Sequence, residues 1–179
     1  MTGDFNNDTI LDLAVANYGS SNIGILLGNG DGTFQSQKPY VTSIGPMHIA
    51  ADDFNNDNKW DLAVVNFNDD SISILLGNGD GTFQDHITYP CGPYPSSIIS
   101  ADLNNDSKFD LAVTNRVGDN TIGVLLGNGD GTFQNRIIYI VGAYPLSITG
   151  GAFRNNFKWD LVVTNGGDNS VTMLSNSCS

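Results

Sequence analysis

Short apolar runs separated by turn residues recur along the whole chain. Between residues 46 and 90, such runs cover residues 46–52, 60–66, 71–76 and 82–89, and glycine, asparagine and aspartate are concentrated between them. Runs of this length, rich in valine, isoleucine and aromatic residues, predict β-strands. Near-continuous apolar runs also indicate strands buried on both faces, as in stacked sheets. The pattern therefore predicts an all-β protein.

Two sequence motifs repeat in a fixed order. The string LLGNGDGTFQ occurs at residues 26–35, 75–84 and 125–134. An acidic string occurs as DFNNDTILDL at 4–13, DFNNDNKWDL at 53–62 and DLNNDSKFDL at 102–111, and a degenerate copy, AFRNNFKWDL, lies at 152–161. The acidic strings begin 49, 49 and 50 residues apart. Four short strands in a unit of about 40–50 residues are typical of a β-propeller blade.

The repeat predicts one β-propeller segment of about four blades, at approximately residues 1–43, 44–92, 93–142 and 143–179. The first unit begins after its first strand, and the last, with strands at 146–151, 159–165 and 170–174, stops before its fourth, so we expect 14 strands. Propellers close with about 4–8 blades. We therefore expect an open segment of a larger propeller. Its ends should leave Leu13, Val15, Val162 and Val163 partly uncovered and favour self-association.

The net charge of the chain limits the kinds of ligand that it can bind. The 179 residues include 7 Lys+Arg and 19 acidic residues, all of them aspartate, which gives a formal charge of −12. A nucleic-acid partner needs a basic face, so this balance argues against one. No apolar run approaches the roughly 18 residues of a membrane-spanning helix, so we expect no membrane segment. The acidic balance suits cation binding.

The acidic string carries the candidate chemistry. Oxygen ligands at its positions 1, 3, 5 and 9, with the carbonyl of position 7, suit calcium, which accepts 6–8 oxygens in flexible geometry. Three carboxylates in one short loop also repel each other unless a cation lies among them. We expect about three calcium sites. Their ligands are Asp4, Asn6, Asp8, the Ile10 carbonyl and Asp12; Asp53, Asn55, Asp57, the Lys59 carbonyl and Asp61; and Asp102, Asn104, Asp106, the Lys108 carbonyl and Asp110.

The fourth copy should bind no metal, because Ala152, Arg154 and Asn156 replace its first three ligands. None of the loops matches an EF-hand, which requires glycine at position 6 and glutamate at position 12; position 6 here is Thr9, Asn58 or Ser107, and the chain has no glutamate. The alternative, that these residues only form Asx-turns, does not require four such residues at alternating positions in three loops.

The remaining features favour structural roles. The glycine-rich string indicates a tight hairpin, so its Asp31, Asp80 and Asp130 are not expected ligands. Repeated aromatics should fill the core between blades, with sugar stacking as the alternative for an exposed one; they are Trp60, Phe109, Trp159, Phe34, Phe83 and Phe133. His48 and His86 are expected to be surface or packing residues. Cys91 and Cys178 favour two structural thiols over a zinc site, and a disulfide between them is the alternative.

The acidic string followed by LLGNGDGTF resembles the FG-GAP/VCBS repeat over essentially the whole chain. The resemblance implies a β-propeller, typically seven-bladed as in integrin α-chain heads, with calcium in the loop between the first two strands of a blade. It also implies an extracellular or cell-surface protein, although residue 1 enters the motif with no signal-peptide pattern, which indicates a fragment of a longer protein.

No catalytic group emerges, so we expect no enzyme. The favoured function is a calcium-binding module for extracellular protein or glycan interaction and adhesion. The alternative is an accessory propeller domain of a secreted enzyme that acts on polysaccharide.

Overall fold

The described part of the computed structural model comprises residues 1–118, 120–154 and 158–176. These residues form 15 strands and one short 3-10 helix, Tyr18–Ser20, with no α-helix. The strands are β1 (Thr2–Gly3), β2 (Asp12–Asn17), β3 (Asn22–Leu26), β4 (Lys38–Val41), β5 (Pro46–Asp52), β6 (Asp61–Asn66), β7 (Ser71–Leu75), β8 (Ile87–Pro90), β9 (Pro95–Ala101), β10 (Asp110–Asn115), β11 (Thr121–Leu125), β12 (Ile137–Ile140), β13 (Pro145–Gly151), β14 (Asp160–Asn165) and β15 (Ser170–Leu174).

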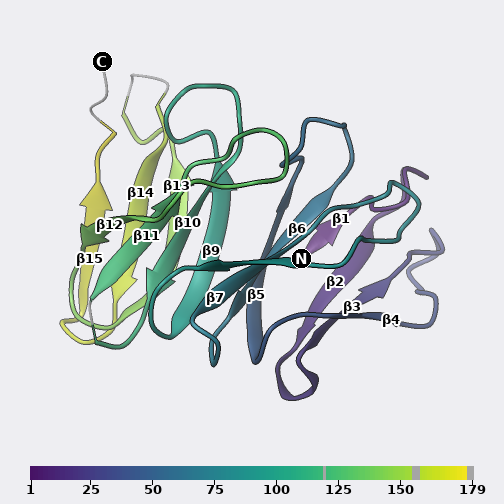
Figure 1. Cartoon of the computed structure of the whole chain (residues 1–179), viewed down its shortest axis with the longest axis horizontal. Helices are drawn as coiled ribbons and strands as arrows, with labels where there is room; N and C mark the ends of the chain where they lie inside the picture. Colours follow the sequence, from purple (N-terminus) through teal and green to yellow (C-terminus); the bar gives the residue numbers. More distant parts are fainter. Residues whose placement is uncertain (119, 155–157, 177–179) are drawn as a thin grey trace.

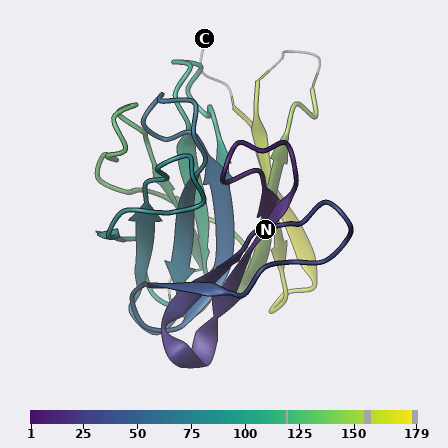
Figure 2. The same cartoon turned by 90° about the vertical axis from the view of Figure 1, so that its right-hand side faces the viewer.

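The strands form four antiparallel sheets in which each strand pairs with its sequence neighbour. Three sheets have four strands, β1–β4, β5–β8 and β9–β12, and the fourth contains β13–β15. The sheets stack in chain order, with the first and the last at opposite ends of the row (Figure 1) and the first strands β5, β9 and β13 close together. The side view in Figure 2 looks onto the end of the row formed by β1–β4. The prediction of open, stacked propeller blades is therefore confirmed.

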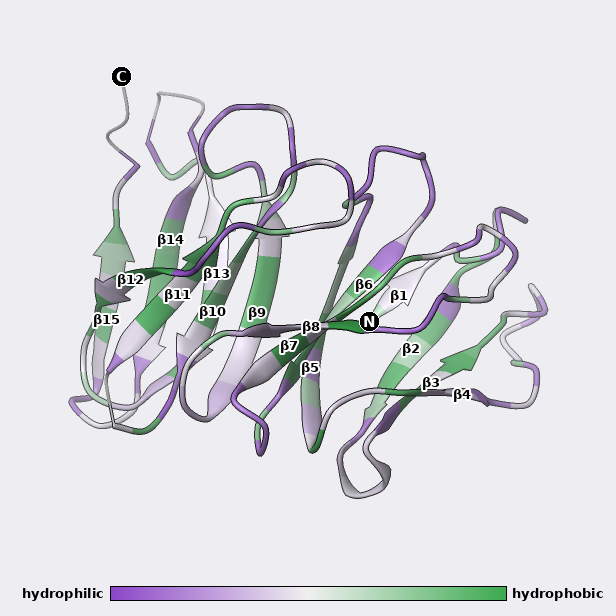
Figure 3. Ribbon diagram, viewed as in Figure 1, coloured by the Kyte–Doolittle hydropathy of each residue, from purple (hydrophilic) through white to green (hydrophobic). Residues whose placement is uncertain are grey.

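The core lies between neighbouring sheets. One cluster joins the first and second sheets through residues such as Ile23 and Val64. A second joins the second and third through Ile72 and Val113, and a third joins the third and fourth. Hydrophobic residues accordingly concentrate along the strands and hydrophilic residues in the loops (Figure 3). Because both faces of an internal sheet are covered, β6 and β10 are buried along their whole length, as the near-continuous apolar runs predict.

Two details of the strand prediction are wrong. The expected 14 strands become 15, because the first three residues suffice to form β1: Thr2 pairs with Leu13 and Gly3 with Asp12. The fourth strand of the second unit starts at Ile87 and not at residue 82. The register of the pairing shifts by one residue between the Ile74–Ile87 pair and the isolated Gly77–Phe83 bridge. This shift interrupts the hydrogen-bonded ladder between the third and fourth strands of the sheet.

The prediction for the end residues holds only in part. Val15 is exposed, and Leu13 and Val162 are half-buried. Val163, however, is fully buried, because it lies on the face of β14 that packs against the third sheet. Since side chains alternate between faces, only one of the two adjacent valines faces the open end.

No helix in the described ranges is long and apolar enough to cross a membrane.

Candidate functional site

The acidic strings form equivalent loops. Each lies between the first and second strands of a sheet, β1–β2, β5–β6, β9–β10 and β13–β14. The three intact loops follow one edge of the stack (Figure 1). An antiparallel pair returns the chain beside its start, so positions 1 and 9 of each string lie at adjoining strand ends. The sequence therefore places the candidate ligands of one loop together and separates the loops by one blade each.

The three intact loops share one backbone conformation. Positions 4 and 6 both have positive φ, as at Asn7 (58°) and Thr9 (68°), and the second and third loops repeat this. A β-branched residue such as threonine rarely adopts this region. Position 6 thus has the conformation that glycine provides in an EF-hand, although the sequence gives no glycine there.

Side-chain oxygens hold this conformation. In the first loop the Asp4 carboxylate accepts the N–H groups of Asp8 at 3.0 Å and Thr9 at 2.8 Å. The Asn6 amide oxygen accepts the Asp8 N–H at 3.2 Å, and the Asp8 carboxylate accepts the Ile10 N–H at 2.8 Å. The same bonds recur in the other intact loops, from Asp53, Asn55 and Asp57 and from Asp102, Asn104 and Asp106. Positions 1, 3 and 5 are thereby gathered on one short turn.

The aspartate at position 9 occupies a different environment. Asp12, Asp61 and Asp110 are fully buried. Asp12 accepts the Phe5 N–H at 2.8 Å with one carboxylate oxygen and the Gly28 N–H at 2.8 Å with the other. It therefore ties the acidic loop to the start of the hairpin within the same blade, a structural role that the ligand assignment alone did not predict.

Negative charge is concentrated in these loops. Burial raises the pKa of Asp61 to about 6; the N–H groups of Gly77 and Phe54 oppose the shift, and the charges of Asp57 and Asp53 add to it. Burial likewise raises the pKa of Asp110, with Asp106 and Asp102 adding to the shift. Like charges in one loop thus disfavour the ionised carboxylates, and a bound cation relieves that cost.

The donor set fits calcium by its chemistry. In the described part of the chain, no three aspartate, cysteine or histidine side chains are arranged as a metal-binding group. Each intact loop still offers carboxylate, amide and peptide oxygens, which are the donors that calcium prefers. A carboxylate oxygen that accepts one N–H retains a further lone pair.

In the fourth loop an arginine side chain forms an ion pair with the remaining aspartate. The Arg154 guanidinium donates to both oxygens of buried Asp160, from Nη2 at 2.6 Å and from Nε at 3.0 Å. It holds the pKa of Asp160 below its ordinary value. The Oδ2 atom of Asp160 thus accepts the Arg154 Nε–H. In the first loop, the Oδ2 atom of Asp12 accepts the backbone N–H of Phe5 instead. Asn156, which replaces a ligand in this loop, lies outside the described residues.

Each intact loop of the first two blades also contacts the glycine-rich hairpin of the next blade. Asn7 donates from its amide to the Gly79 carbonyl at 3.2 Å, and Gly81 donates its N–H to the Phe5 carbonyl at 2.8 Å. The ring of Phe83 packs edge-on against those of Phe5 and Tyr40. The same contacts recur one blade further along. There they are made by Asn56, Gly131, Phe54, Phe133 and Tyr89.

We call this arrangement the hairpin–loop contact. Sequence reasoning assigned the hairpin only a turn, although the identical asparagine at position 4 of each intact acidic string was a signal for it. Asp31, Asp80 and Asp130 do serve the turn, since each accepts the N–H and hydroxyl of the threonine two residues later.

The aromatic prediction is only partly correct. Phe83 and Phe133 are buried between blades, and Phe109 packs against the cluster that contains Phe133. Trp60, Trp159 and Phe34 are exposed. The tryptophans directly precede β6 and β14, so they lie outside the stacked sheet faces. Cys91 is a buried free thiol; Cys178 lies outside the described residues.

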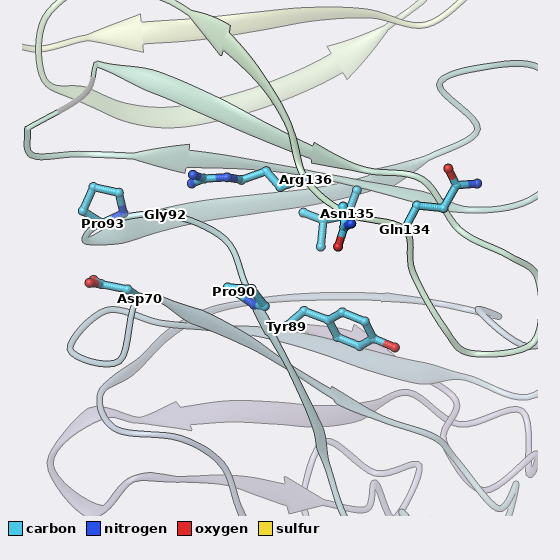
Figure 4. A pocket seen from close by; sticks show the side chains of 9 residues that line it. Asp70, Tyr89, Pro90, Gly92, Pro93, Gln134, Asn135 and Arg136 are labelled. Carbon is cyan, nitrogen blue, oxygen red and sulfur yellow. The ribbon is translucent and has the colours of Figure 1, made fainter.

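Two related grooves run between the outer strands of neighbouring blades. The one between the second and third blades has a volume of about 340 Å³, with Asp70, Pro93 and Arg136 at one end and Tyr89 and Gln134 at the other (Figure 4). The Arg136 guanidinium donates to the Cys91 carbonyl at 2.7 Å. The groove between the first and second blades, of about 430 Å³, has Tyr40, Gln84, Asp85 and His86 at the corresponding positions. His86 thus lines a groove.

Comparisons with solved structures show the fold. The chain is similar to a chain of the Photorhabdus luminescens Tc holotoxin pore, with a TM-score of 0.54 and 16% identity over 92% of this chain and 8% of that one. It is also similar to BBS1N from its complex with ARL6DN, with a TM-score of 0.58 and 16% identity over 98% of this chain and 52% of that one. It therefore spans only part of the length of either chain.

The comparison with curated proteins finds no match. The sequence model of the FG-GAP-like repeat matches residues 4–64 and 53–113. These two matches contain all three intact acidic strings and cover more than half of the sequence. The chain belongs to the FG-GAP-like repeat family.

Proposed function

We propose that this chain is a calcium-binding repeat module for interaction with a protein or glycan ligand outside the cell, with no catalytic role of its own. The observation that carries the proposal is the threefold recurrence of one acidic loop with one backbone conformation and one set of side-chain hydrogen bonds. A catalytic carboxylate pair would not need a copy in three blades.

Calcium would use the loop oxygens already gathered on each turn. The residues that would hold it are those at positions 1, 3, 5 and 9 with the carbonyl of position 7. When bound, the ion supplies positive charge that offsets the mutual repulsion of the carboxylates. The fourth loop supports this reasoning, because the one blade that has lost the acidic residues has gained Arg154 against Asp160.

Calcium in these loops would stabilise the stacking of blades. Phe5 and Asn7 belong to the first acidic loop and contact the second blade directly. An ion that fixes the loop therefore also fixes the surface on which the next hairpin docks. Extracellular calcium modules bind with dissociation constants of roughly 10⁻⁴–10⁻³ M, so such sites would be filled outside the cell and largely empty inside it.

The grooves between blades are the proposed ligand surface. Their tyrosine and carboxamide side chains recur at the same repeat positions, and their volumes lie within the range of about 300–1,000 Å³ found for ligand sites. One equivalent position changes from His86 in one groove to Arg136 in the next, so the two grooves would select different ligands or different parts of one ligand.

Thermal unfolding with calcium or with a chelator tests the metal proposal. A ligand at a hundredfold excess over its dissociation constant stabilises by about 2.7 kcal/mol per site. We expect calcium to raise the melting temperature of the wild type, and an Asp53→Asn/Asp57→Asn variant to lose part of that increase. Asp80→Asn is the matched control, because it removes an exposed aspartate that lies outside the ligand set. An unchanged melting temperature on chelation would contradict the proposal.

A further inference from the structure

The boundary between the second and third blades has two charged residues and a tyrosine that the boundary before it lacks. They are Asp70, Tyr94 and Arg136, and the equivalent residues one repeat earlier are Ser21, Gly45 and His86. Asp70 and Arg136 line one end of the groove between these blades (Figure 4), and Tyr94 directly follows Pro93, which lines the same end. These three residues therefore give this groove a chemistry of its own.

Two glycines leave room for the Arg136 side chain. A methyl group added at Gly123 would lie 2.7 Å from its Cδ atom, and one added at Gly92 would clash with its Nη1 atom. Nη1 donates to the Cys91 carbonyl at 2.7 Å. One repeat earlier, serines occupy both glycine positions, at Ser43 and Ser73. The guanidinium is thus fixed in place, while its other N–H groups have no hydrogen-bond partner among the described residues.

Asp70 presents an acceptor at the same end of the groove. Its Oδ1 atom accepts the Tyr94 N–H at 2.8 Å, and its Oδ2 atom has no partner in the part of the chain that the structure describes. Burial is the main cause of the raised pKa of the Cys91 thiol, which the charge of Arg136 lowers and that of Asp70 raises further. Both charges thus act on one thiol, yet neither of the two ion pairs among the described residues joins them.

Tyr94 has a backbone conformation that tyrosine rarely adopts. Its φ is 50°, and Gly45, with a φ of 74°, has the equivalent position one repeat earlier. The turn therefore does not require a tyrosine, which directs attention to the side chain. The Tyr94 ring lies 5.3 Å from the ring of Phe67, and Tyr94 is still 43% exposed. A supported aromatic ring beside polar groups is suited to stacking on the apolar face of a sugar ring.

We propose that this end of the groove binds a neutral sugar unit of a glycan. Tyr94 stacks on the sugar ring, the Oδ2 atom of Asp70 accepts a hydrogen bond from one hydroxyl group, and the Arg136 guanidinium donates to a neighbouring oxygen. The inference rests on the proposed function, and it specifies the class of ligand and the boundary between blades that binds it.

The charges of the site select against charged ligands. An acidic sugar would pair with Arg136 but would meet Asp70 and a chain whose formal charge is −12. A basic side chain of a protein ligand would pair with Asp70 but would be repelled by Arg136. A hydroxyl group both donates and accepts hydrogen bonds, so neighbouring hydroxyls of a neutral sugar satisfy both residues at once. The groove volume of about 340 Å³ suits a short sugar segment.

Binding of the whole chain to an array of immobilised neutral and acidic glycans tests the proposal. We expect neutral glycans to bind, and glycans that end in a sialic or uronic acid not to bind. Titration with the neutral glycan that binds best then compares two site variants. Asp70→Asn removes the charge but keeps an acceptor for the Tyr94 N–H, as Asn120 accepts the Tyr144 N–H at 3.1 Å. Tyr94→Gly introduces the residue found at position 45. Each variant should bind about tenfold more weakly or worse.

Tyr144→Gly is the matched control. Tyr144 resembles Tyr94 in its φ of 58° and its exposure of 41%, but its ring lies 4.7 Å from the guanidinium of Arg116, at the next boundary between blades. This variant should bind the glycan as tightly as the wild type. Circular dichroism checks that all three variants retain their strands.

The possible failures can be told apart. If a neutral glycan binds the wild type and both site variants equally well, or if the control loses binding as they do, the assignment to this groove is wrong and glycan binding by the chain stands. If no neutral glycan binds, or if acidic glycans bind better, the inference is overturned. Calcium binding and a protein ligand would then remain, because the melting temperatures in calcium and in chelator test the metal sites separately.

Discussion

Replacing Phe133 with alanine should destabilise the chain far more than replacing Phe34, although both residues lie in an identical ten-residue string. The ring of Phe133 is 7% exposed and lies 5.5 Å from that of Phe54 and 5.7 Å from that of Tyr89, both in the preceding blade. Phe34 is 41% exposed and has no preceding blade in this chain. The two replacements therefore differ only in the hairpin–loop contact.

The size of the difference follows from burial. Truncating a buried phenylalanine to alanine costs about 3–5 kcal/mol, of which edge-on ring pairs contribute about 0.5–1.5 kcal/mol each. Exposed positions usually change the free energy of unfolding by only about 0.5 kcal/mol. For a chain of this length 1 kcal/mol shifts the melting temperature by roughly 2–4 °C, so Phe133→Ala should lower it by roughly 6–20 °C.

Urea unfolding, followed by tryptophan fluorescence, measures both variants at a concentration where the chain is monomeric. The urea dependence of the unfolding free energy should stay constant, so that a change in midpoint reports stability. Phe83→Ala should behave like Phe133→Ala, because Phe83 makes the same contacts one blade earlier. If Phe34→Ala proves as destabilising as Phe133→Ala, the hairpin would stabilise its own blade and not the contact between blades.

Three further predictions concern single positions. Gly81→Ala should lower the urea midpoint more than Gly32→Ala. Both glycines have positive φ, but only a methyl group at position 81 would meet a neighbour, Leu27 at 2.9 Å. Equal losses in the two variants would argue against the hairpin–loop contact. Burial raises the pKa of Cys91 to about 12, so a Cys178→Ser variant should resist iodoacetamide at pH 8 until it is unfolded, as mass spectrometry would show; labelling of the native chain would contradict this burial. Arg154→Ala should lower the melting temperature equally in calcium and in chelator, because no ion replaces the lost guanidinium; a loss confined to chelator would indicate a fourth metal site.

The sequence was most informative where the repeat made the pattern unambiguous. The alternation of turn residues and apolar runs placed β5–β7 and β13–β15 within one residue of their observed limits. The acidic strings could be located because oxygen-bearing side chains at alternating positions have few other uses. Arg154 could be recognised as an exception because it places a positive charge where the three intact acidic strings have an uncharged asparagine.

Contacts between blades could not be derived in the same way. They depend on which face of a strand meets which neighbour, and a one-residue change reverses that, as Val162 and Val163 show. The burial of Asp12, Asp61 and Asp110 was equally hidden, because their two N–H donors come from residues 7 positions earlier and 16 or 17 positions later in the chain. Trp60 was misassigned because aromatic character alone does not distinguish a loop position from a core position.

Isothermal titration of the metal-free chain with calcium tests the central proposal most directly. Three intact acidic loops and one loop neutralised by Arg154 predict a stoichiometry of about three ions per chain. The same titration on a variant with Ala152→Asp, Arg154→Asn and Asn156→Asp, which restores the motif in the fourth loop, should give about four. A folded wild-type chain that binds no calcium would contradict the account, and four ions bound by the wild type would contradict the role assigned to Arg154.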